Sequence, residues 1–167
     1  SIHDRGHPAD AIEHYHRAIA LQPDCVNAHA NLGNALKLGG DLAGAAKSYQ
    51  RALAFKPDFA EAIHNLGSVE LALGNYDEAR ECYDRAVRLK PEFANAHKNL
   101  SQVWLLLEDF ERGWPEYEWR WKCAKFPSPR RGFTQPLWTG QDPAGKRVLV
   151  YAEQGLGDII QFIRYAP

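Results

Sequence analysis

The sequence contains no methionine and only three cysteines among its 167 residues. Cys25, Cys82 and Cys123 are far apart and form no CxxC or Cys/His spacing, so neither a disulfide framework nor a structural zinc site is expected. Reduced thiols are typical of the cytoplasm, which is the compartment we predict. A chain without an initiating methionine is expected to be a piece of a longer protein.

Long apolar runs and an excess of charge of one sign are also absent. Lys and Arg number 20 against 21 Asp and Glu, which gives a formal net charge of -1. This balance argues against nucleic acid or an anionic membrane surface as a partner. Because a membrane-spanning helix needs roughly 20 apolar residues and no stretch approaches that, we expect no membrane span.

A repeat of 34 residues organises most of the chain. Small residues let two helices approach closely, tyrosines fill the space between turns, and prolines end the second helix of each pair. The repeat therefore predicts a series of antiparallel helix pairs. The columns that share this step are Pro23/Pro57/Pro91, Leu32/Leu66/Leu100, Ala11/Ala45/Ala79/Gly113, Tyr15/Tyr49/Tyr83/Tyr117 and Ala18/Ala52/Ala86.

The segments "NLGNALKLGGDLAGAAKSYQRALAFKP" and "NLGSVELALGNYDEARECYDRAVRLKP" closely resemble the tetratricopeptide repeat family. The resemblance implies an all-α fold, a right-handed superhelix of antiparallel helix pairs. The last repeat departs from the family pattern at Ser101, Glu108 and Arg120, so we interpret it as a cap. The predicted units are a partial repeat at 1–25 (its second helix), full repeats at 26–59 and 60–93, and the degenerate capping repeat at 94–122.

A solenoid of this family has a concave groove lined by the first helix of each repeat, and such grooves bind a protein or an extended peptide. Asn31, Asn65 and Asn99 occupy one column of this face. Since one amide both donates and accepts, an asparagine ladder can bind a peptide backbone without reading side chains; it is similar to the ladder of O-linked N-acetylglucosamine transferases. Solvated or packing roles fit the sequence equally well. The predicted peptide-binding residues are Asn27, Asn31, Asn34, Glu61, Asn65, Ser68, Asn95, Asn99 and Gln102.

The seven histidines do not form a metal-binding pattern. His14 and His16 are two residues apart and point to different sides of a helix. His29 and His97 share a column with Ile63, which cannot bind a metal. We therefore predict no metal site.

All five tryptophans lie within residues 104–138. The spacing of Phe110, Trp114, Tyr117 and Trp121 predicts that this region continues as the second helix of the last repeat. We interpret the aromatic cluster as a clamp between the solenoid and the next domain, and a stacking platform for a carbohydrate or nucleobase is the alternative.

Residues 123–145 are rich in proline and glycine and predict an extended linker. Residues 146–167 then predict a buried strand, a turn containing Gly155 and Gly157, and an amphipathic helix. This is a single βα unit of a truncated Rossmann-like domain. The dinucleotide fingerprint is not met, because Ile160 stands where its third glycine belongs.

Three segments in order, "YEWRW" at residues 117–121, Trp138 to Gly140, and "RVLVYAEQGLGDIIQF", resemble bacterial proteins that fuse tetratricopeptide repeats to a GT-B glycosyltransferase domain of the heptosyltransferase kind. The resemblance implies that Asp158 is the base that deprotonates the acceptor hydroxyl. Helix capping explains Asp158 equally well. A nucleotide sugar is implied for the full-length protein, and no cofactor for this piece.

The sequence thus favours the protein-binding scaffold of a larger, bacterial glycosyltransferase, in which this piece binds a partner rather than catalysing. A non-enzymatic adaptor protein built from the same repeats is the alternative. Because a lone βα unit leaves apolar residues and a strand edge uncovered, we expect it to lie against the aromatic region, to self-associate with a second copy, or to be poorly ordered.

Overall fold

The computed structural model describes residues 8–126, 132–134, 142, 144–145 and 147. The chain divides into two compact units, residues 1–123 and 124–167. The described residues include no strand. The predicted linker is described only in part, and the predicted βα unit at 146–167 lies outside the described residues except for Arg147.

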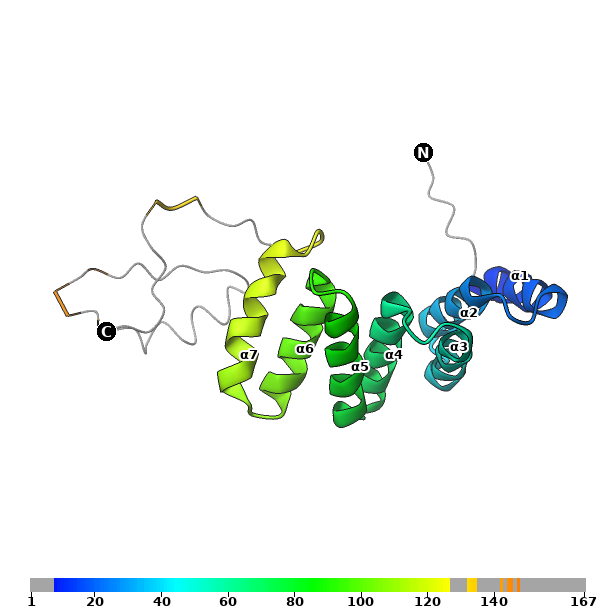
Figure 1. Cartoon of the computed structure of the whole chain (residues 1–167), viewed down its shortest axis with the longest axis horizontal. Coiled ribbons are helices and arrows are strands. Elements are labelled where there is room, and N and C mark those ends of the chain that lie inside the picture. Colours follow the sequence, from blue (N-terminus) through cyan, green and yellow to red (C-terminus); the bar gives the residue numbers. More distant parts are fainter. Residues whose placement is uncertain (1–7, 127–131, 135–141, 143, 146, 148–167) are drawn as a thin grey trace. The chain divides into compact units, whose positions relative to one another are not determined.

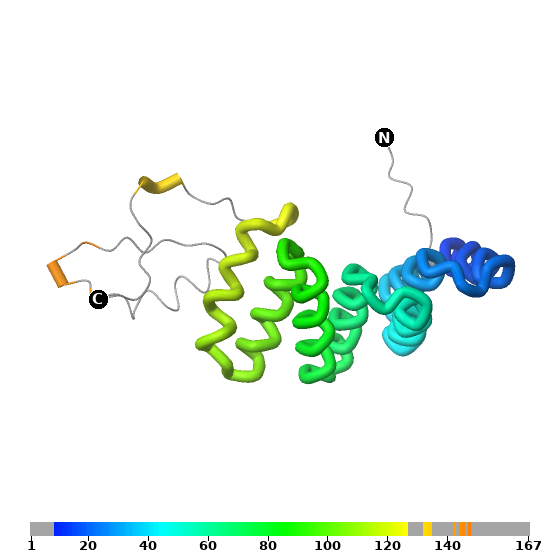
Figure 2. Tube along the Cα trace, viewed as in Figure 1, coloured from blue at the N-terminus to red at the C-terminus, as the bar shows by residue number. Residues whose placement is uncertain are grey.

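Helices follow one another through the described part of the first unit (Figure 1). Each helix packs against the next along the chain, and α2 also contacts α4, as α4 contacts α6. The tube in Figure 2 shows this succession in the order of the sequence. The predicted all-helical repeat solenoid is confirmed. The elements are α1 (Pro8–Leu21), α2 (Val26–Leu38), α3 (Leu42–Phe55), α4 (Ala60–Leu73), α5 (Tyr76–Leu89), α6 (Ala94–Leu106), α7 (Phe110–Tyr117) and the 3-10 helix η1 (Glu118–Lys122).

The core of each full repeat is a tyrosine held against a glycine. Tyr49 on α3 and Tyr83 on α5 are completely buried. A Cβ atom on Gly33 would lie 2.7 Å from Cε1 of Tyr49, and one on Gly67 would lie 3.0 Å from Cε1 of Tyr83. The tyrosine ring therefore fills the space that any side chain at the glycine would need.

Aspartate caps begin α3 and α7, and prolines end α3 and α5. The side chains of Asp41 and Asp109 each accept a hydrogen bond from the backbone N–H three residues on, at 2.8 and 3.0 Å. These bonds satisfy donors that the first turn of a helix leaves unpaired. At the other end, α3 and α5 stop two residues before Pro57 and Pro91, because proline cannot continue a helix.

The turns after the first helices use the left-handed backbone region. Gly40 and Gly74 have φ angles of 85° and 84°, whereas Glu108 has a φ of 61° at the equivalent position after α6. A residue with a Cβ pays about 1–2 kcal/mol in this region. The last turn therefore carries a cost that the preceding two avoid.

The second helix of the last repeat is shorter than the aromatic spacing predicts. α7 ends at Tyr117, and the chain continues as the 3-10 helix η1. Arg120 stands in an alanine column, is buried, and donates from Nη1 to the Tyr117 carbonyl at 3.1 Å. That carbonyl is the acceptor a continuing α-helix would use for the Trp121 N–H. None of the helices in the described part of the chain is long and apolar enough to cross a membrane.

Candidate functional site

The three ladder asparagines lie one on each first helix, Asn31 on α2, Asn65 on α4 and Asn99 on α6. These helices contact one another in that order, and we call the surface predicted to carry the nine residues the first-helix face. Asn31 is exposed, and Asn65 and Asn99 are half-buried. The face comprises Asn27, Asn31, Asn34, Glu61, Asn65, Ser68, Asn95, Asn99 and Gln102.

Asn34 connects three helices at one end of this face. The Tyr49 hydroxyl donates to Oδ1 of Asn34 at 2.7 Å, and Nδ2 of Asn65 donates to the same oxygen at 3.1 Å. Burial raises the pKa of Tyr49 to about 12, so the hydroxyl stays protonated and remains a donor at neutral pH. The orientation of the Asn34 amide is therefore fixed by the core.

His64 lies between two of the ladder residues, Asn65 and Asn99. Its Nδ1 is 3.3 Å from Oδ1 of Asn65, and its Nε2 is 3.0 Å from Nδ2 of Asn99 on the next first helix. The imidazole centroid is 5.5 Å from that of Tyr83 and 4.8 Å from that of Phe93. Burial of this ring lowers the pKa of His64.

Sequence reasoning missed His64, although one signal was available. The equivalent positions in the neighbouring repeats are Ala30 and Lys98. A lone imidazole in a column of unlike residues, directly beside a ladder asparagine, marks a position where one repeat does something its neighbours do not.

The remaining members of the face fall into two groups. Ser68 accepts from the Tyr83 hydroxyl at 3.2 Å and donates to the His64 carbonyl at 3.1 Å, so it belongs to the core network. Glu61 accepts from Nζ of Lys90 at 2.8 Å, and this hydrogen bond is the main reason that its pKa is lowered. The members with exposed side chains are Asn27, Asn31, Glu61, Asn95 and Gln102.

Gln102 also lines an apolar groove of about 620 Å³. Leu106 and Trp114 form part of its wall and are 57% and 58% exposed. The groove therefore joins the polar first-helix face through one shared side chain. Its other lining residues are Leu71, Tyr76, Leu105 and Tyr117.

Trp104 and Trp119 contact side chains of the helical array through their ring faces. The Trp119 ring lies parallel to that of His97, with centroids 3.8 Å apart, and Nζ of Lys122 lies 3.6 Å from the Trp119 centroid. The guanidinium groups of Arg80 and Arg112 lie 5.4 and 4.8 Å from the Trp104 centroid. These contacts account for Trp104 and Trp119 within the array, and the interdomain clamp stays a prediction.

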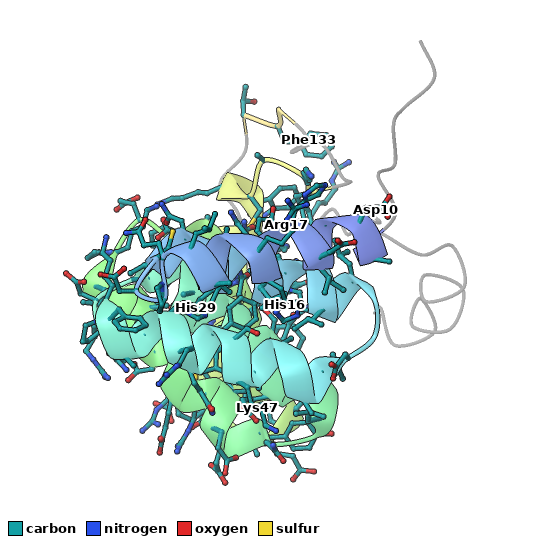
Figure 3. The ribbon with its side chains drawn as sticks, turned by 90° about the vertical axis from the view of Figure 1, so that its right-hand side faces the viewer. Asp10, His16, Arg17, His29, Lys47 and Phe133 are labelled. Carbon is teal, nitrogen blue, oxygen red and sulfur yellow. The ribbon has the colours of Figure 1, made fainter. Side chains whose placement is uncertain are left out.

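The buried histidines have structural partners. Nε2 of His29 and of His97 bond the carbonyls of Pro23 and Pro91 at 2.8 and 2.7 Å. His29 also lies well away from His16 of α1 (Figure 3). Across the described helices and turns, no three His, Cys, Asp or Glu side chains come together as metal ligands. Gly155, Gly157 and Asp158 lie outside the described residues, and their roles stay predictions.

Family models match most of the helical region. Models described as tetratricopeptide repeat match residues 4–60 and 48–81, and one described as TPR repeat matches residues 67–105. Protein FlbA of Caulobacter vibrioides is 42% identical over 55 residues, which is 33% of this chain and 9% of FlbA. The chain therefore spans less than a tenth of the length of that relative.

Solved structures share the same fold. A crystal structure of MamA is 27% identical, with a TM-score of 0.66 over 70% of this chain and 68% of MamA. The first TPR of Spaghetti (RPAP3), bound to the HSP90 peptide SRMEEVD, is 23% identical, with a TM-score of 0.61 over 62% of this chain and 82% of that chain; at this identity the likeness shows the fold alone. Residues 4–105 of the chain are tetratricopeptide repeats.

Proposed function

We propose that the helical unit is a protein-binding scaffold that holds an extended peptide segment of a partner along the first-helix face. The observation that carries this proposal is the single file of amides across α2, α4 and α6, with Asn31 exposed and Asn65 and Asn99 held by neighbours. Packed helices are about 8–10 Å apart, and an extended chain rises about 3.3 Å per residue. One ladder amide therefore meets the peptide backbone about every third residue.

The comparison with RPAP3 is consistent with this mode of binding. That protein has the same fold and was solved with a peptide bound. The ladder of this chain is uncharged, so the preferred segment is selected by its extended backbone more than by its charge. The apolar groove beside Gln102 offers room for a bulky apolar side chain at one end of the segment.

A selected peptide tests the proposal. Linear peptides are selected from a random phage-displayed library against the chain, synthesised, and measured by fluorescence anisotropy. Replacing Asn31, Asn65 and Asn99 together with alanine removes three hydrogen-bonding positions, each worth about 0.5–1.5 kcal/mol, so binding is expected to weaken by about tenfold or more. N-methylation of peptide backbone amides is expected to weaken binding similarly while leaving the side chains intact.

The matched control is Gln50→Ala, an exposed amide removed from the second helix α3. This variant is expected to bind the peptide as the unmodified chain does. Circular dichroism melting identifies any loss caused by unfolding. Unchanged affinity in the folded triple variant, or no selection of peptides above background, contradicts the proposal.

We also propose that the whole protein is a cytoplasmic, bacterial glycosyltransferase that uses a nucleotide sugar, with Asp158 as its base. The support is the sequence resemblance at residues 117–121, Trp138–Gly140 and Gly155–Asp158. An adaptor without transferase activity is the competing function, and the coding sequence after Pro167 separates the two. Several hundred further residues rich in βα units favour the enzyme, whereas a stop codon soon after Pro167 rules it out.

In a full-length transferase, Asp158→Asn is expected to abolish sugar transfer and to leave peptide binding by the repeats unchanged. Wild-type transfer rates in that variant would assign Asp158 to helix capping instead. Peptide affinity, measured on the same preparation, shows whether the repeats remained folded.

A further inference from the structure

The hydrogen-bond donors on the first-helix face run in one direction. Nδ2 of Asn99 on α6 lies 3.0 Å from Nε2 of His64, and an amide nitrogen has only hydrogens to offer. Nε2 must therefore supply its lone pair, which places the proton of the neutral ring on Nδ1. Nδ1 in turn lies 3.3 Å from Oδ1 of Asn65, an acceptor.

The same direction continues onto α2. With its oxygen facing His64, Asn65 directs Nδ2 toward Oδ1 of Asn34 at 3.1 Å, and the Tyr49 hydroxyl donates to that oxygen as well. Each side chain in the series thus fixes the orientation of the next, from α6 through α4 to α2. Reversing one amide would oppose two donors or two acceptors at the neighbouring contact.

We propose that His64, as the neutral tautomer protonated on Nδ1, is a positioning residue that fixes the orientation of the Asn65 and Asn99 amides. The proposal rests on the proposed function of the first-helix face. One hydrogen of Asn99 Nδ2 points to the ring, and Asn99 also hydrogen-bonds the Tyr83 side chain. The atom that Asn99 presents to a peptide is therefore Oδ1, which accepts from a backbone N–H. His64 thereby determines which peptide group the α6 end of the face recognises.

Protonation of His64 would reverse this arrangement. Nε2 would then carry a hydrogen facing the Asn99 amide hydrogens, so Asn99 must rotate and offer Oδ1 to the ring. Its N–H groups would replace the acceptor that a peptide meets. The α6 end of the face therefore exchanges an acceptor for donors when the ring becomes charged.

The surroundings of the His64 ring confine its protonation, and with it the change of Asn99 from acceptor to donor, to pH values below 7. Burial and Lys37 on α2 disfavour the charged ring, and Asn65, Glu61 and the Asn95 backbone favour it, with a net lowering of the His64 pKa from 6.5. The titratable Tyr83 on α5 packs against the ring at an interplanar angle of 51° and is neutral, because burial raises its pKa. The neutral tautomer therefore dominates at pH 7.

Nuclear magnetic resonance of the uniformly labelled chain tests the proposal without any ligand. Long-range proton–nitrogen correlations distinguish a ring protonated on Nδ1 from one protonated on Nε2, and the His64→Gln spectrum assigns the signals. We expect Nδ1 protonation at pH 7. As the pH falls, the side-chain amide signals of Asn65 and Asn99 should shift with the midpoint of His64.

Two variants separate this effect from a general response to acid. His64→Gln keeps a donor and an acceptor but does not titrate, so its Asn65 and Asn99 amide signals should stay constant. His16→Gln removes an exposed histidine of α1 and should behave as the unmodified chain. A ring protonated on Nε2, or amide signals that ignore the His64 titration, overturns the proposal.

The library-selected peptide supplies the functional readout. Its affinity for the unmodified chain should fall about tenfold below the His64 midpoint, since one hydrogen bond is replaced by a mismatch, and should stay level in His64→Gln. If the peptide affinity does not change with pH in either the unmodified chain or His64→Gln, while the Asn65 and Asn99 amide signals of the unmodified chain do shift, the positioning role is overturned. If the ladder variant binds the peptide normally while the ring has the expected tautomer, the proposed function fails and the hydrogen-bond assignment stands.

Discussion

The repeat at residues 60–93 and the last repeat at 94–122 solve the same packing problem with different residues. In the former, Gly67 of the first helix faces Tyr83, and Ala79 stands on the second helix. In the latter, the first helix carries Ser101, and Gly113 of the second helix faces the Leu105 side chain, where a Cβ would lie 2.6 Å from Cδ2. A close crossing needs a small residue, and either helix can supply it.

The two repeats also differ in the size of the side chain buried near the end of the second helix. Ala86 is completely buried, whereas the equivalent Arg120 is buried with hydrogen bonds to the Tyr117 carbonyl and to Glu118 at 3.1 and 2.6 Å. Tyr83 is completely buried, and Tyr117 is only half-buried. The last repeat thus depends less on a tight tyrosine core and more on polar contacts.

The largest expected difference concerns the tyrosines. Tyr83→Ala should lower the free energy of unfolding by about 3–5 kcal/mol, because a completely buried ring leaves a cavity. Tyr117→Ala should cost about half as much, since its ring already meets solvent. Urea denaturation followed by circular dichroism measures both. Equal losses would show that the last repeat has the same core as its neighbour.

The next largest effect tests the exchange of small residues. Gly67→Ala places a Cβ 2.9 Å from Cβ of Cys82, which cannot move without the helix, so overpacking should cost about 1–3 kcal/mol despite the better helix propensity of alanine. Ser101→Ala is the matched variant at the equivalent position and should change stability by less than about 1 kcal/mol. Comparable destabilisation by the two substitutions would contradict the exchange.

A smaller effect of opposite sign is expected at the turns. Glu108→Gly should raise the free energy of unfolding by about 1 kcal/mol, because glycine relieves a φ of 61°. Gly74→Ala should lower it by about the same amount, since alanine is strained at 84°. Thermal melting of the Glu108→Gly and Gly74→Ala variants measures both changes. A Gly74→Ala variant more stable than the unmodified chain would refute the argument from backbone strain.

The smallest effect concerns an ion pair that the last repeat lacks. Glu61 accepts from Lys90, whereas the equivalent residue is Asn95. Because its folded pKa is lowered from 4.5, Glu61 contributes stability above that pH and loses it as the pH falls through the folded value. Glu61→Gln should remove about 0.5 kcal/mol at pH 7 and nothing at pH 2. Urea midpoints at the two pH values, compared with Asn95→Ala, test this difference.

The sequence predicted the helix pairs because their determinants repeat. Glycine against tyrosine, and proline after the second helix, recur every 34 residues. The placement of Asn31, Asn65 and Asn99 on successive first helices follows from the same register. What the pattern did not reveal is that Asn65 and Asn99 are already hydrogen-bonded, because His64 and Asn99 are brought together from adjacent repeats by packing and not by spacing.

The sequence also did not show that the hydrogen bond to the proline carbonyl comes from a different position in the middle repeat. His29 and His97 bond the carbonyls of Pro23 and Pro91. At the intervening position Ile63 cannot do so, and Arg85 donates to the Pro57 carbonyl instead. Comparison of the repeats shows only that the histidine is missing there. In the structure, Arg85 of α5 donates to the carbonyl that the histidine would otherwise bond.

The hydrogen bonds to these three proline carbonyls differ in how far they are exposed to water. His29 and His97 are each 7% exposed, so water competes poorly for the bonds that tie the first and third turns. Arg85 is exposed, and the bond that ties the middle turn is open to solvent. Under tension applied to the two ends of the array, we therefore expect the Arg85 bond to the Pro57 carbonyl to break before the two histidine bonds.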